Sequence, residues 1–160
     1  MSTYTVTETG ARELAGKVAS DLRQFSLHYG EPAWSDIPDY MEELEALLHR
    51  GYLSTYSFGY RQNGSWMMAY HYEVTGGQLT GGRPGGIEPN IDISGATYFN
   101  YVTYSDDWWR LTAAQREAFR ATLTIERVNA EEPSYAGGVW VETRAYGAGG
   151  TELRRRLFKR

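Results

Sequence analysis

The chain has 160 residues, of which 41% are hydrophobic and 22% charged, and its formal net charge is −4. This balance is typical of one globular domain with a buried core and excludes a largely disordered chain. Because it contains no cysteine, disulfides, thiolate catalysis and Cys-ligated metal sites are excluded. No signal peptide and no apolar stretch of membrane-spanning length is found, which favours a cytoplasmic protein without membrane contact.

Two amphipathic helices are predicted in the first third of the chain. Apolar residues recur at steps of three and four in residues 11–29 and again in residues 37–48, the spacing of one buried helical face. Thr9 is the expected N-cap of the first helix, because its hydroxyl can accept a free backbone amide. Gly51 is expected to end the second.

Three glutamates of the second helix, Glu42, Glu43 and Glu45, fall outside its apolar stripe. Carboxylates this close together could serve as metal ligands or acid–base groups. At these spacings, however, they are interpreted as a solvated helix face.

A β-hairpin is predicted next. Residues 52–60 and 66–74 are rich in aromatic and hydroxyl side chains and flank Asn63-Gly64, the pair that most favours a two-residue hairpin turn. Residues 96–105 form a further predicted strand.

The glycine-rich stretch at residues 75–95 is interpreted as a flexible connection. Its Gly-Gly-Arg-Pro-Gly-Gly core lacks the Gly-Lys-Ser/Thr ending of a phosphate-binding loop, so a nucleotide site is not expected.

The last third predicts one more helix and a terminal hairpin. Thr112 and Gln115 have the spacing of a capping box that opens the helix. Strands are expected at residues 124–128, 139–146 and 151–158. The fold class is therefore α+β, with three helices packed on a mostly antiparallel sheet.

Catalytic and metal-binding residues are not evident. His28, His49 and His71 share no metal-ligand spacing and are interpreted as structural. Trp108 and Trp109 could form a ligand platform, but they precede the third helix and are expected to pack against it. The sequence thus predicts no cofactor, no metal and no enzymatic activity.

The C-terminal residues 154–160 carry five basic side chains. Such a cluster can form a nucleic-acid-binding arm. Since Leu157 and Phe158 interrupt it, the alternative is one face of a terminal strand, and both interpretations stay open.

Several stretches together resemble the bacterial HORMA family over about residues 4–158. The glycine-rich segment departs from the resemblance, because the family's linker there is more acidic. The stretches that carry it are Ala-Arg-Glu-Leu-Ala-Gly-Lys-Val-Ala-Ser-Asp-Leu-Arg (11–23), Asp-Tyr-Met-Glu-Glu-Leu (39–44), Tyr-Ser-Phe-Gly-Tyr (56–60), Ser-Gly-Ala-Thr-Tyr-Phe (94–99) and Gly-Val-Trp (138–140).

The resemblance implies a fold and a mechanism. A HORMA-like domain has three helices on a sheet and a C-terminal hairpin, the safety belt, which wraps around a partner's closure-motif peptide. The peptide adds to the sheet edge as an extra strand. One domain over residues 1–160 is expected, with a core at 1–128 and a belt at 129–160.

Site residues follow from the same resemblance. The expected peptide-binding edge strand comprises Thr124, Ile125, Glu126, Arg127 and Val128. The expected belt anchors are Trp140, Val141, Tyr146, Leu157 and Phe158.

The implied function is regulatory. The resemblance points to a CBASS-type anti-phage system, in which the protein binds and activates a cyclic-oligonucleotide synthase of the cGAS/DncV-like nucleotidyltransferase kind. An AAA+ ATPase would reset it, and association with nucleic acid would be indirect. The rival hypotheses are a direct nucleic-acid binder using the basic C-terminal residues and an enzyme of unknown reaction.

Overall fold

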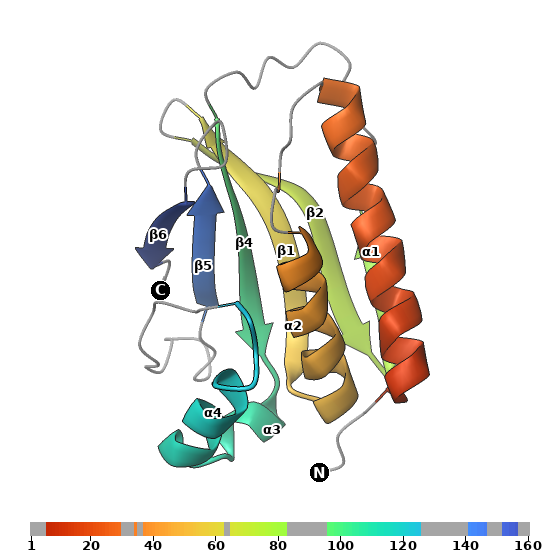
Figure 1. The fold of residues 1–160 in the computed structure, drawn as a ribbon, viewed down its shortest axis with the longest axis vertical. Coiled ribbons are helices and arrows are strands. Elements are labelled where there is room, and N and C mark those ends of the chain that lie inside the picture. The colour runs from red at the N-terminus through yellow and green to blue at the C-terminus, as the bar shows by residue number, and fades with distance from the viewer. Residues whose placement is uncertain are drawn as a thin grey trace.

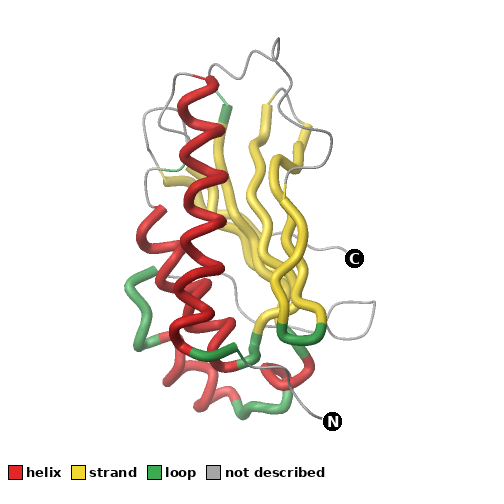
Figure 2. The backbone as a smooth tube through the Cα atoms, turned by 90° about the vertical axis from the view of Figure 1, so that its right-hand side faces the viewer, coloured by secondary structure: helices red, strands yellow, loops and turns green. Residues whose placement is uncertain are grey.

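A computed structural model describes residues 6–29, 34, 37–62, 65–82, 96–125, 141–146 and 152–156. Two layers are visible edge-on in Figure 2, with the long helices on one side and the strands on the other. This arrangement confirms the α+β class. No helix among these residues combines the length and apolar character that a membrane span requires.

The helical layer consists mainly of α1 (Glu8–Tyr29) and α2 (Ile37–Arg50), which lie side by side on one face of the sheet (Figure 1). The N-cap of α1 is Thr7 and not Thr9 as predicted, because the Thr7 hydroxyl accepts the amide of Gly10 at 3.0 Å. Gly51 ends α2 as predicted, with a φ of 76° that only glycine adopts without strain.

The sheet is antiparallel throughout its described strands, in the order β3-β2-β1-β4-β5-β6. The predicted hairpins and the strand between them are confirmed, whereas the turn residues Asn63 and Gly64 lie outside the described residues. The strands are β1 (Leu53–Gln62), β2 (Ser65–Thr75), β3 (Gln78–Gly82), β4 (Thr97–Tyr104), β5 (Val141–Tyr146) and β6 (Glu152–Arg156).

Strand β3 lies inside the stretch that was expected to be a flexible connection, so that expectation is wrong for residues 78–82. Gly76 and Gly77 have φ angles of 59° and 80°, which is the geometry of a two-residue turn that matches strand twist. They place Gln78 opposite Thr75 and start the β2–β3 ladder.

Aromatic rings fill the space between the helices and the sheet. Trp34, from the connection between α1 and α2, is 1% exposed. Its ring centroid lies 5.1 Å from that of Phe25, 5.6 Å from Phe58 and 5.5 Å from Tyr98. One side chain thus joins α1 to the two central strands.

A partly buried polar contact ties α1 to β2. The Tyr72 hydroxyl donates to Asp21 Oδ2 at 2.6 Å. Burial raises the pKa of the Tyr72 phenol, and the hydrogen bond to Asp21 raises it further. The phenol therefore keeps the proton that makes this link.

At one end of the molecule, two short helices follow β4. Helix α3 (Asp106–Trp109) is a single turn that was not predicted, and α4 (Ala113–Arg120) carries the predicted capping box between Thr112 and Gln115. Trp108 is 0% exposed and meets Phe119 of α4 edge-on at 5.7 Å. The expectation that it packs against this helix is confirmed.

Candidate functional site

The C-terminal hairpin, defined here as β5 with β6, lies along the edge of β4 (Figure 1). Strand β5 pairs antiparallel with β4 from Tyr98 opposite Tyr146 to Thr103 opposite Val141. β6 pairs only with β5 among the described strands. The hairpin is thus the last addition to the sheet on this side.

Strand β4, by contrast, is built into the core. Tyr98, Asn100, Val102 and Tyr104 alternate along it and are all at most 3% exposed, the pattern of a strand with one buried face. Tyr104 also stacks on Trp108, with ring centroids 4.2 Å apart. The C-terminal hairpin, at the periphery of the sheet, therefore pairs with a strand that belongs to the core.

Hydrogen bonds join the end of β4 to the two residues that follow α2. The amide of Ser105 donates to the Tyr52 carbonyl at 2.8 Å, and its hydroxyl donates to the Gly51 carbonyl at 2.7 Å. These bonds hold β4 independently of β5.

Two predicted belt anchors fall in this arrangement. Val141 and Tyr146 are the first and last residues of β5. Trp140, Leu157 and Phe158 lie outside the described residues.

The predicted edge strand is not found where it can be checked. Thr124 and Ile125 lie in a bend after α4, and Glu126, Arg127 and Val128 lie outside the described residues. The physical reason lies in their partners: the Thr124 amide donates to Glu42 Oε1 at 2.8 Å, and Ile125 is buried in the core at 4% exposure. In the described structure the strand that pairs with the C-terminal hairpin is β4.

One glutamate of α2 also differs from the prediction. Glu43 is 1% exposed, and its Oε1 lies 2.8 Å from the Tyr56 hydroxyl of β1. Glu42 holds the Thr124 amide. The solvated-face interpretation is wrong for Glu43, because β1 supplies a hydrogen-bond donor that the helical pattern does not show. Glu42 is exposed as predicted, although it also accepts this backbone amide.

We expect Tyr56→Phe to lower the free energy of unfolding by about 1–3 kcal/mol, because it leaves a buried carboxylate short of a donor. In a Glu43→Leu background the same substitution should cost much less. Urea denaturation of the single and double variants gives the coupling energy, which we expect to be about 1 kcal/mol or more. Additive effects would show that the contact contributes no coupling.

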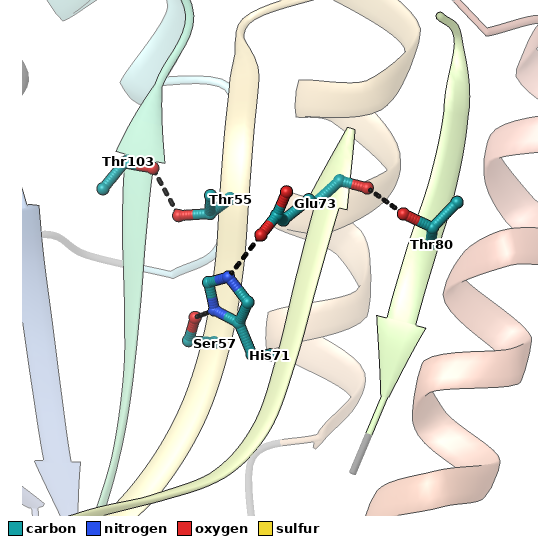
Figure 3. Close-up of polar contacts among 6 residues, drawn as sticks. All are labelled: Thr55, Ser57, His71, Glu73, Thr80 and Thr103. Atoms are coloured by element: carbon teal, nitrogen blue, oxygen red, sulfur yellow. Dashed lines mark hydrogen bonds and ion pairs between the residues drawn. The ribbon is translucent and has the colours of Figure 1, made fainter. Parts of the chain in front are cut away.

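A second polar group lies on the face of the sheet away from the helices. Ser57 Oγ lies 2.8 Å from His71 Nδ1, and His71 Nε2 lies 3.1 Å from Glu73 Oε2 (Figure 3). Thr55–Thr103 and Thr80–Glu73 contacts extend this group across four strands.

This arrangement resembles the order of groups in a serine hydrolase. Ser57, however, is 0% exposed, so a substrate carbonyl cannot reach its oxygen. The geometry suits a network that ties neighbouring strands. Within the described residues no three His, Asp or Glu side chains gather as a metal site would require.

Solved structures define the class of protein. One chain of the E. coli MS115-1 CdnC:HORMA-deltaN complex superposes on this chain with a TM-score of 0.62 at 29% identity, covering 99% of this chain and 94% of that chain. For the E. coli MS115-1 HORMA:CdnC:Trip13 complex the values are 0.63, 31%, 99% and 95%. The fold is that of a HORMA domain.

The profile of bacterial HORMA domain family 1 matches residues 1–159, and the chain belongs to this family. A similar relative is CD-NTase-associated protein 7 of Escherichia coli (strain MS 115-1), which is 36% identical over 156 residues, 96% of this chain and 90% of the relative. The resemblance deduced from the sequence is confirmed.

Proposed function

We propose that this chain is a regulatory, non-catalytic protein of the bacterial cytoplasm that binds a closure-motif peptide and activates a cyclic-oligonucleotide synthase in anti-phage defence. The observation that carries the proposal is the C-terminal hairpin on the edge of β4. Such a hairpin is held largely by main-chain hydrogen bonds, which a foreign extended peptide can make equally well.

The partners follow from what the relatives are named for. The E. coli relative is a CD-NTase-associated protein, and the two solved structures pair HORMA with CdnC, one of them with Trip13 as well. For this chain we propose a cGAS/DncV-like nucleotidyltransferase as the activated synthase. We propose an AAA+ ATPase of the Trip13 kind as the factor that opens the safety belt and releases the bound peptide, and we call the belt with the sheet edge that it covers the clasp.

The belt in this proposal is residues 129–160, anchored by Trp140, Val141, Tyr146, Leu157 and Phe158. Two observations favour β4 over residues 124–128 as the edge that receives the peptide. Thr124 and Ile125 are engaged by Glu42 and by the core, and β4 is held in place without β5. In the described structure β5 occupies that edge, so the peptide would bind after the hairpin leaves.

Co-expression tests this proposal directly. We expect the affinity-tagged chain to retain a cGAS/DncV-like nucleotidyltransferase that is encoded in the same operon and to raise second-messenger production at least about tenfold over the synthase alone. Nucleotide products are measured by chromatography. Retention without any change in product would reduce the role to a scaffold, and failure to retain the synthase would contradict the proposal.

The same preparation tests the nucleic-acid hypothesis. Residues 154–156 lie in β6, as the terminal-strand interpretation predicted. Salt-sensitive binding of short oligonucleotides that is lost when these arginines are replaced would favour the nucleic-acid alternative.

A further inference from the structure

A pocket of about 340 Å³ opens where α4 meets the C-terminal end of α2. It belongs to neither β4 nor the C-terminal hairpin, and in Figure 1 α4 occupies the lower corner of the molecule. Its lining is mostly apolar, and its size is at the lower end of the range of ligand pockets in proteins. The lining residues are Arg50, Tyr52, Leu111, Gln115, Ala118, Phe119 and Thr122.

The floor of this pocket is preformed. The Phe119 ring is 8% exposed and meets Tyr52 edge-on at 5.3 Å and Trp108 at 5.7 Å. Trp108 is itself fully buried. A floor fixed on several sides loses little conformational entropy when a side chain binds to it.

Of the described residues that line the pocket, one is a cation, Arg50. The Arg50 guanidinium lies 5.9 Å from the centroid of the Phe119 ring, and within the described part of the chain it takes part in no ion pair. Among the described residues that line the pocket none is acidic. A carboxylate entering it would therefore meet a guanidinium without a competing anion.

Other arginines of α4 add positive charge nearby. Arg116 and Arg120 lie over the rings of Trp109 and Trp108, at 5.6 and 5.5 Å. The shape, the aromatic floor and this charge together complement a ligand that is apolar at one point and anionic beside it.

We propose that this pocket is a docking site for an acidic peptide segment of a protein partner, with one large apolar side chain on Phe119 and an adjacent carboxylate on Arg50. A nucleic acid fits less well, because the pocket is small and its described lining offers one guanidinium, whereas a chain of phosphates binds along a row of cations. The proposal does not depend on the movement of the C-terminal hairpin.

Designed peptides test the site without a known partner. The probe is acetyl-Asp-Asp-Trp-Asp-Asp-amide, and the comparisons replace Trp by Ala or every Asp by Lys. We expect saturable NMR shifts at the amides of Gln115, Ala118 and Thr122 with the acidic tryptophan peptide. The other two peptides should bind at least about tenfold more weakly.

Matched variants of the full chain locate the binding. Arg50→Glu and Ala118→Leu should each weaken the acidic probe at least about tenfold, the first by charge and the second by filling the pocket. Arg23→Glu and Ala114→Leu, exposed positions outside the pocket, should leave its affinity unchanged. Far-UV circular dichroism confirms that each variant is folded.

Three results would overturn the proposal. They are equal binding of the acidic and basic probes, affinity that Arg50→Glu and Ala118→Leu leave unchanged, and preferential shifts at the same amides by a short single-stranded DNA. Because no synthase is present, failure here leaves the proposed clasp untouched, and failure of the clasp leaves this site untouched.

Discussion

A disulfide that ties β4 to β5 will abolish peptide-dependent capture of the synthase, and reduction will restore it. Tyr101 and Thr143 lie directly opposite each other in the β4–β5 register, a separation that a disulfide can bridge. Because the chain has no cysteine of its own, Tyr101→Cys with Thr143→Cys can form no other disulfide within one molecule. The expected effect is close to all-or-none, since a locked hairpin leaves no free β4 edge.

The control is a cross-link between strands that have no need to separate. Thr55→Cys with Glu73→Cys joins β1 to β2 at a directly opposed pair and should capture the synthase equally in the oxidised and reduced states. Capture is measured by pull-down with and without reductant, and the cross-link is followed by mass spectrometry. If the oxidised β4–β5 variant retains the synthase fully, the hairpin is not the moving clasp.

Trp34→Ala will lower the free energy of unfolding by about 3–5 kcal/mol, the usual cost of removing a fully buried tryptophan. The side chain is 1% exposed and contacts three rings from α1, β1 and β4. Against a typical total of about 5–15 kcal/mol, this loss would leave much of the protein unfolded near 37 °C.

Urea denaturation measures this effect, and two variants calibrate it. Trp34→Phe keeps part of the ring packing and should cost less than Trp34→Ala. Leu27→Ala removes a side chain that is 76% exposed and should change the stability by no more than about 0.5 kcal/mol. A cost below about 1 kcal/mol for Trp34→Ala would show that the helices and sheet do not depend on this contact.

Local sequence determined the elements whose signals lie within a few residues. The three- and four-residue spacing of apolar residues specifies α1 and α2, and Thr112 with Gln115 starts α4 through its own capping box. The hairpin of β1 and β2 follows from alternation around Asn63-Gly64. The order of motifs along the chain also sufficed to identify the HORMA family.

Contacts between distant residues decided the rest. Glu43 has the spacing of a solvated glutamate, but Tyr56 of β1 provides a hydroxyl that allows its burial. Ile125 is β-branched, which favours a strand, but its side chain is buried in the core. The amide of the preceding residue, Thr124, donates to Glu42. A single sequence does not reveal such donors and cavities, because they come from segments brought together only by folding.

The edge of the sheet was decided in the same way. Both β4 and the C-terminal hairpin were predicted as strands, but their pairing depends on how the chain returns across the molecule. The tendency to form a strand is a property of each segment, whereas the choice of the neighbouring strand depends on how the whole chain folds. The sequence therefore determined the individual strands, and only the tertiary structure showed that the C-terminal hairpin pairs with β4.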